Sequence, residues 1–294
     1  MSGDNWGSLF KASKLGDFSA FGKLLTKIER ASVKEAFSAS ELCQSERRAF
    51  RIGITGPPGA GKSTLVGQLL SLFKAEKLRI GVLAVDPSSP FSKGAILGDR
   101  IRYLEHFLDE NIFIRSIGSR GSLGGLTGAA YLMLRAFDVA GFDIVLIETV
   151  GVGQTELEIV NVADHISVIF VPESGDSIQA MKAGLTEIGD LFIVNKSDRP
   201  GSELIRKELE MNLALSERTS SCPIFNTVAS KGEGVSEVFQ ELMRASQAES
   251  FKARRLSVER LQQEAKALLR SEMEGELNKK VSHINNEQDL FKLF

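Results

Sequence analysis

The 294-residue chain has few of the residues that mark metal, disulfide and membrane proteins. Its two cysteines, Cys43 and Cys222, lie far apart, and its three histidines are scattered, so no disulfide framework or thiol–imidazole ligand set is assembled. Because disulfides are typical of oxidising compartments, we expect a reduced, cytoplasmic setting. The longest apolar run has six residues, whereas a membrane-spanning helix needs roughly 20.

Positive and negative charges are also nearly balanced. Lys and Arg number 36 against 38 Asp and Glu, a net charge of −2, so nothing favours nucleic acid or an anionic membrane as a partner. The first ten residues contain no apolar block, and we expect no secretory signal. Hydrophobic residues make up 43%, enough for a sizeable core of one large domain or two small ones.

From residue 50 onward, short runs rich in Ile and Val alternate with longer stretches of helical spacing. The predicted strands are Phe50–Thr55, Ile80–Val85, Ile112–Ile117, Asp143–Glu148, Ile166–Pro172, Leu191–Asn195 and Ile224–Val228. Consecutive apolar positions are typical of strands buried on both faces, and the alternation predicts a mostly parallel sheet with helices on both sides. We therefore predict an α/β domain over residues 48–246.

Two helical segments flank this predicted domain. In residues 1–47, apolar side chains recur every three or four positions from Leu15 to Ile28, which predicts an amphipathic helix packed on a neighbouring surface. Residues 247–294 form a C-terminal arm rich in Glu, Lys, Arg, Leu and Gln. Its apolar stripe, which runs from Leu256 to Leu269, predicts either a lid on the core or a dimerisation arm.

The first predicted strand leads directly into a glycine-rich loop. Residues 56–63 match the phosphate-binding pattern G-x-x-x-x-G-K-S/T, and a predicted helix follows. Glycines let the backbone curl its N–H groups around a phosphate chain, and the helix N-terminus adds positive potential. Lys62 is expected to span the β- and γ-phosphates, and Ser63 to supply an oxygen to Mg²⁺. The predicted nucleotide contacts here are Gly56, Pro57, Pro58, Gly59, Ala60, Gly61, Lys62, Ser63 and Thr64.

Three acids are candidates for the metal and for catalysis. Glu148 ends a buried strand shortly before Gly151, an arrangement in which nucleotide switches hold Mg²⁺ and sense the γ-phosphate. Asp86 and Asp99 bracket a loop rich in Pro, Ser and Gly. Either carboxylate could approach Mg²⁺ or order the attacking water.

The sequence has no glutamine at the usual position for orienting that water. In Ras-like GTPases a Gln follows the switch glycine. Here Val152 stands at that position, and Gln154 comes two residues later. Either Gln154 serves after a rearrangement or a partner completes the site, so we expect slow hydrolysis by the chain alone. Arg115 and Arg120 could stabilise γ-phosphate charge, although an exposed arginine is the commoner situation.

Residues 195–198 read N-K-S-D directly after a predicted strand, the base-reading arrangement of GTPases. The Asp198 carboxylate can accept hydrogen bonds from guanine N1–H and the exocyclic amine, whereas adenine would leave it unpaired. Asn195 is expected to tie this loop to the phosphate loop, and Lys196 to lie along the base. The predicted base contacts are Asn195, Lys196, Asp198, Val228 and Ala229, the last through its N–H on guanine O6.

Together these motifs resemble the MeaB/ArgK family of P-loop GTPases. The resemblance rests on residues 86–91 (DPSSPF), 94–100 (GAILGDR), 120–125 (RGSLGG), 148–154 (ETVGVGQ) and 195–198 (NKSD), and it extends from about residue 15 to about residue 270. It implies a three-layer P-loop NTPase fold with a mostly parallel central sheet, an N-terminal helical segment and a C-terminal helical arm.

The resemblance also implies a function. It points to a homodimeric, Mg²⁺-dependent GTPase that binds GTP and GDP and chaperones an adenosylcobalamin-dependent acyl-CoA mutase of the methylmalonyl-CoA mutase type. Such a chaperone gates cofactor delivery and protects or reactivates the mutase, with an adenosyltransferase as a further candidate partner. In this chain Lys93 replaces a glycine of the family's first switch, and the arm is short.

Two other functions remain open at this stage. A metallochaperone GTPase for a nickel enzyme would share the fold, but such proteins insert metals through Cys and His clusters that this sequence does not assemble. A nucleotide-gated binding module with negligible turnover is favoured by the absence of Gln next to Gly151. Hydrolysis measured with and without the mutase would separate this module from the chaperone.

Overall fold

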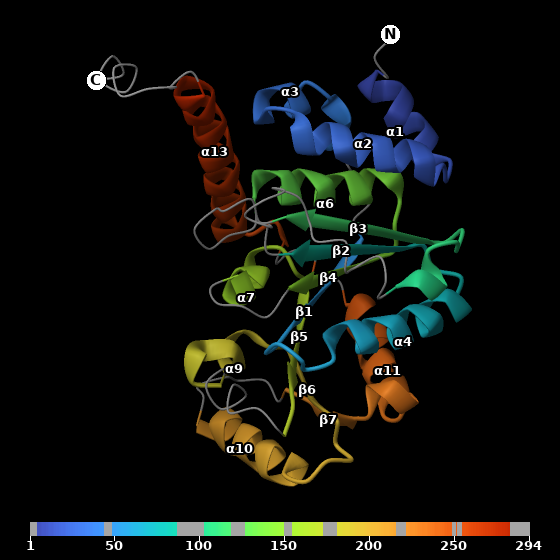
Figure 1. Ribbon diagram of the computed structural model, residues 1–294, viewed down its shortest axis with the longest axis vertical. Coiled ribbons are helices and arrows are strands. Elements are labelled where there is room, and N and C mark those ends of the chain that lie inside the picture. Colours follow the sequence, from blue (N-terminus) through green and yellow to red (C-terminus); the bar gives the residue numbers. More distant parts are fainter. Residues whose placement is uncertain are drawn as a thin grey trace.

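The computed structural model describes residues 5–43, 49–86, 103–118, 127–149, 155–172, 181–215, 222–248, 251 and 255–282. In these ranges a seven-stranded parallel sheet carries helices on both faces (Figure 1). The strand order is β3-β2-β4-β1-β5-β6-β7. The strands are β1 (Phe50–Thr55), β2 (Ile80–Asp86), β3 (Ile112–Gly118), β4 (Ile144–Thr149), β5 (His165–Phe170), β6 (Leu191–Asn195) and β7 (Ile224–Thr227).

All seven predicted strands are confirmed, with ends that shift by no more than two residues. The packing of β4 shows why the strands consist of consecutive apolar residues. Ile144 and Leu146 belong to one core, while Val145 and Ile147 belong to the core on the opposite face. A strand covered on both sides needs apolar residues at every position, and so it has no polar face.

Helices of unequal number cover the two faces of the sheet. On one face, α4 (Lys62–Ala75) and α11 (Val235–Ser246) share a core with the strands. On the other, α6 (Gly128–Ala140) packs on the sheet, and α1 (Trp6–Lys14), α2 (Phe18–Arg30) and α3 (Val33–Phe37) stack over α6 (Figure 1). The remaining elements are η1 (Ser40–Leu42), η2 (Leu104–His106), α7 (Thr155–Glu158), η3 (Ile159–Asn161), η4 (Met181–Leu185), α9 (Thr186–Ile188), α10 (Ser202–Leu215), η5 (Ala229–Lys231) and α13 (Val258–Val281).

The N-terminal helices join the main core through aromatic rings. The Phe21 ring of α2 packs edge-on against Phe113 and Phe137, with centroids 4.8 and 5.0 Å apart. The predicted stripe is wrong at Leu15, which is 82% exposed. The reason is local: α1 ends at Lys14, and Asp17 starts a new helix by accepting a hydrogen bond from the Ala20 N–H at 2.9 Å.

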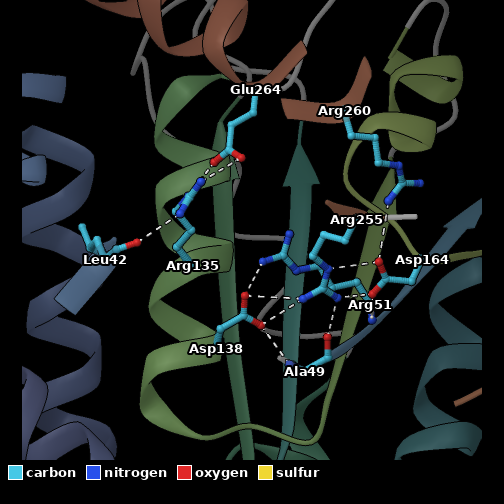
Figure 2. Close-up of polar contacts among 9 residues, drawn as sticks. All are labelled: Leu42, Ala49, Arg51, Arg135, Asp138, Asp164, Arg255, Arg260 and Glu264. Carbon is cyan, nitrogen blue, oxygen red and sulfur yellow. Dashed lines mark hydrogen bonds and ion pairs between the residues drawn. The ribbon is translucent and has the colours of Figure 1, made fainter. Parts of the chain in front are cut away.

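The C-terminal arm is attached to the domain through buried charges (Figure 2). Arg255, just before α13, is 7% exposed and pairs with two buried carboxylates, Asp138 of α6 and Asp164 at the start of β5. It also donates to the Ala49 carbonyl at 2.6 Å. Arg51 of β1 shares Asp138, with 2.7 Å between Nη2 and Oδ2. Burial lowers the pKa of the Arg51 guanidinium, and the Asp138 charge opposes that shift.

A hydrogen bond and an ion pair continue this attachment along α13 itself. Arg260 donates to the Val160 carbonyl at 2.7 Å, and Glu264 pairs with Arg135 of α6 at 2.6 Å. Leu268 is the buried apolar residue of α13, whereas Leu261, Leu269 and neighbouring apolar side chains face outward. The arm therefore contacts the core mainly through charge, and most of its predicted apolar stripe is exposed.

Candidate functional site

The phosphate loop joins β1 to α4 at the middle of the sheet's carboxyl edge. Gly56 and Gly61 have φ angles of 141° and 86°, which disfavour any residue with a Cβ. A Cβ on Gly56 would lie 2.2 Å from the Ile169 carbonyl oxygen, and one on Gly61 would lie 2.4 Å from Asn195 Nδ2. These glycines therefore allow the chain both to curl and to approach its neighbours closely.

Lys62 reaches back over the loop that precedes it. Its ammonium group donates to the carbonyls of Gly56 and Pro57 at 2.6 and 3.0 Å, and its side chain is buried. Since α4 begins at Lys62, a buried positive charge and a helix N-terminus lie together at the end of the loop. This combination is suited to a phosphate chain.

Two oxygen-bearing residues meet beside the loop. Ser63 Oγ donates to Glu148 Oε1 at 2.6 Å, and the Glu148 side chain is buried. In the sheet, Ala84 lies opposite Glu148 and Val85 opposite Thr149, so the backbone of Asp86 ends at the same edge. Oxygen donors from a hydroxyl and carboxylates are those that Mg²⁺ prefers, and the residues present fit such an ion.

Tyr103 is a neighbour of this site that no sequence motif predicts. Its hydroxyl donates to Glu148 Oε2, and its side chain is 1% exposed. No motif includes this tyrosine, because its contact with Glu148 joins positions 45 residues apart. The side chain of Asp86, and all of Asp99, Gly151 and Gln154, lie outside the described residues.

The base-reading loop is tied to the phosphate loop by Asn195. Its Nδ2 donates to the Ala60 carbonyl at 2.8 Å, which is the link expected from the sequence. Its Oδ1 accepts hydrogen bonds from Thr227 Oγ1 and the Ala229 N–H, both at 3.0 Å. The N–H of Ala229, predicted to meet guanine O6, thus has Asn195 as its partner here. The Val228 N–H donates to the Glu233 carbonyl at 3.0 Å.

Of the other residues in the base-reading motif, Lys196 is half-buried and Asp198 is exposed. Lys196 has a positive φ of 56°, a conformation that is uncommon outside glycine. The Asp198 carboxylate is 41% exposed and pairs with Lys231 of η5 at 3.2 Å. Lys231 is a second residue at the site that no sequence motif predicts. The Asp198 carboxylate is therefore open to solvent, and its lysine partner is exposed as well.

A cavity of about 950 Å³ brings together part of the predicted site, whereas Asn195, Asp198, Val228 and Ala229 are not among its lining residues. A volume of this order suits a small-molecule ligand. It is lined by Pro58, Gly59, Gly61, Lys62, Ser63, Thr64, Gly67, Gln68, Ser71, Glu105, His106, Glu148, Thr149 and Lys196. Loop glycines, the buried lysine, the Ser63–Glu148 pair and Lys196 therefore face one shared space.

Arg115 lies elsewhere. It is on β3, at the edge of the sheet, and pairs with Glu29 of α2 at 2.5 Å. The structure therefore gives it a role in holding the N-terminal helices.

Across the described ranges, no three or more His, Cys, Asp and Glu side chains form a group that could hold a metal ion, and no helix is long and apolar enough to cross a membrane.

Comparison with known proteins identifies relatives. The family model for the methylmalonyl-CoA mutase-associated GTPase MeaB matches residues 21–286. A putative GTPase of Pyrococcus horikoshii is 43% identical over 239 residues, covering 80% of this chain and 75% of the relative. The mouse methylmalonic aciduria type A homolog, described as mitochondrial, is 36% identical over 223 residues, covering 74% of this chain and 54% of the relative.

Solved structures support the fold. An LAO/AO transport system kinase superposes with a TM-score of 0.66 at 24% identity, covering 96% of this chain and 88% of the other. The hydrogenase maturation factor HypB of Archaeoglobus fulgidus gives a TM-score of 0.51 at 19% identity, covering 73% and 95%. The sheet, the phosphate loop and the GTPase relatives together define a P-loop GTPase. The chain belongs to the family of methylmalonyl-CoA mutase-associated GTPases, MeaB.

Proposed function

We propose that this GTPase hydrolyses GTP to GDP and phosphate with Mg²⁺ and chaperones an adenosylcobalamin-dependent acyl-CoA mutase of the methylmalonyl-CoA mutase type. It gates delivery of the cofactor to the mutase and protects or reactivates that enzyme. The observation that carries the chemistry is the contact between Ser63 and Glu148, 2.6 Å apart beside the phosphate loop. The choice of partner rests on the family match.

Lys62 and the backbone N–H groups of the protein hold the phosphate chain of the nucleotide. Lys62 exchanges its contacts with the Gly56 and Pro57 carbonyls for the β- and γ-phosphate oxygens. Ser63 and Glu148 hold Mg²⁺, together with Asp86 and Asp99. When bound, the ion neutralises charge that develops on the phosphates.

For recognition of the base, the proposal rests on the N-K-S-D motif at the end of β6. Asp198 accepts two hydrogen bonds from guanine, and Lys196 lies along the ring. Asn195 maintains the separation of base and phosphates, because it bonds the Ala60 carbonyl and the Ala229 N–H at once. Val228 lies beside Ala229 and contributes backbone contacts near the base.

The nucleotide state controls the surface that the mutase meets. In the GTP state, residues of the segments 86–100 and 148–156 contact the γ-phosphate, with the Gly151 N–H as one donor. Hydrolysis removes that phosphate and with it these contacts. Since Val152 replaces the usual glutamine, Gln154 or a residue of the mutase orients the water, and hydrolysis is slow without the partner.

A second copy of the chain binds through the exposed stripe of α13. Large apolar side chains recur there at intervals of three, four or eight residues. They are Val258, Leu261, Leu269, Met273, Leu277 and Val281, each at least 38% exposed. A stripe of this kind is typical of a helix that packs on a partner helix, which supports a homodimer.

Single-turnover hydrolysis tests the chaperone function. We expect the mutase to accelerate GTP hydrolysis by about tenfold or more, within the range reached when a partner completes a GTPase site. Lys62→Ala serves as the control for contaminating hydrolysis. Negligible GTP hydrolysis both with and without the mutase would instead favour the nucleotide-gated binding module.

Capture from native cells then tests the partner. The chain is loaded with GDP or with a non-hydrolysable GTP analogue, and bound proteins are identified by mass. We expect an acyl-CoA mutase in one nucleotide state, with an adenosyltransferase as a further candidate. Recovery of a nickel enzyme in its place would favour the metallochaperone alternative.

A further inference from the structure

Glu148 is held from both sides by hydroxyl groups. Ser63 of α4 donates to Oε1 at 2.6 Å, and Tyr103 donates to Oε2. The side chains of Tyr103 and Glu148 are 1% and 4% exposed, so water does not compete freely for these contacts. A buried carboxylate is thereby fixed in one orientation by two elements far apart in the sequence.

The Tyr103 ring does not depend on Glu148 for its own position. It belongs to the hydrophobic core between α4 and the sheet, together with residues such as Leu69 and Val82. Packing therefore sets where the hydroxyl lies, and the hydroxyl in turn sets where Oε2 lies. With Oε2 fixed, Oε1 stays directed at Ser63.

We propose that Tyr103 is a positioning residue for Mg²⁺: it orients the Glu148 carboxylate so that the ion binds beside Ser63. The inference rests on the proposed function, because it assumes that Ser63 and Glu148 hold the ion. Partners that orient a metal-binding carboxylate typically change metal affinity by about 10–100-fold when removed. Tyr103 touches neither nucleotide nor ion in this assignment, and it acts only through Glu148.

The test compares Tyr103→Phe with Tyr131→Phe. Phenylalanine keeps the ring that fills the core and removes the hydroxyl. Tyr131 is the chain's other tyrosine and is also buried, but it belongs to the core on the opposite face of the sheet. The measurement is the rate at which a fluorescent GDP analogue leaves the full chain, over a range of Mg²⁺ concentrations. Mg²⁺ bound at the phosphates slows this release.

We expect Tyr103→Phe to raise the Mg²⁺ concentration for half-maximal slowing by about tenfold. Its release rate in excess EDTA should match that of the unmodified chain, and Tyr131→Phe should change neither quantity. The shift should disappear when Glu148→Gln is already present, because the hydroxyl then has no metal ligand to orient. Thermal unfolding of each variant shows that the fold is retained.

Two results would overturn the inference. One is an unchanged Mg²⁺ midpoint in Tyr103→Phe. The other is faster release of equal size at every Mg²⁺ concentration, EDTA included, which is the signature of a purely structural role. Failure of the proposed function is distinguishable from both, since GDP release from the unmodified chain would then not respond to Mg²⁺.

Discussion

Asn195 and Ala60 are joined by a hydrogen bond of 2.8 Å between the Nδ2 group and the carbonyl oxygen, although 135 residues separate them. Because Oδ1 of the same side chain also accepts from Thr227 and Ala229, one amide links the loops that follow β1, β6 and β7. The asparagine is 2% exposed. The phosphate loop and the base-reading loop are thus held at a fixed separation.

Lys62→Ala should abolish tight binding of GTP and GDP. The substitution removes the buried ammonium group that lies over the phosphate loop, while the N–H groups of the loop remain. Isothermal titration calorimetry measures the affinity. Lys207→Ala, on the exposed side of α10, is the matched control and should bind normally. Normal binding of GTP by Lys62→Ala would contradict the phosphate-site assignment.

Asp198→Asn should shift the preference from guanosine to xanthosine nucleotides. The amide presents a donor where guanine expects an acceptor, whereas xanthine carries an oxygen at that position. Competition between GTP and XTP for the chain measures the change. Retention of the GTP preference in this variant would show that Asp198 does not read the base.

Charges placed on the exposed stripe of α13 should separate the proposed dimer. Leu269 and Met273 are 64% and 69% exposed, so glutamates at both positions cost little within one chain. They would instead place unpaired charges in a helix–helix interface. Sedimentation velocity of Leu269→Glu/Met273→Glu should give a monomer. A dimer unchanged by this double substitution would exclude the stripe as the interface.

Arg255→Met should destabilise the whole domain by about 3–5 kcal/mol, because the buried Asp138 and Asp164 carboxylates lose a shared cation. Urea unfolding measures the loss. Arg244→Met is the control: its pair with Glu241 lies on the surface, and we expect little change. Equal stability of Arg255→Met and the unmodified chain would mean that the network adds nothing to folding.

Tyr131 provides a test of pH dependence. Burial, followed by the negative charges of Glu264 and Glu158, raises the pKa of Tyr131 to about 12. Since the ordinary value is about 10, the folded state favours the protonated phenol. The associated stability is present below pH ~10 and is lost as the pH rises toward 12. Ultraviolet titration of Tyr103→Phe, where Tyr131 is the remaining tyrosine, should give a midpoint well above 10.

Much of the fold is predictable because its causes are local. Each of the seven strands is an apolar run bounded by polar or turn residues, and the phosphate loop has a fixed spacing between β1 and α4. The link through Asn195 is also predictable, since the N-K-x-D pattern specifies it. The prediction for Leu15 is wrong because the cap at Asp17 restarts the helix.

Other features depend on residues that only the fold brings together. Tyr103 meets Glu148, and Lys231 meets Asp198, across 45 and 33 positions of sequence. The contact between Arg255 and the Ala49 carbonyl spans 206 positions. Arginine and aspartate side chains are mostly exposed in proteins, so a sequence predicts them at the surface. No neighbouring residues in the sequence mark the few that form ion pairs in the interior.

The anchoring of Arg255 bears on how shortened versions of this protein behave. A chain cut after the last residue of α11 would keep every strand that the structure describes and the whole cavity beside the phosphate loop, yet it would leave Asp138 and Asp164 enclosed with less compensating charge. Its poor solubility or weak nucleotide uptake would then reflect a damaged interior. Such a fragment would say nothing about whether the arm takes part in catalysis.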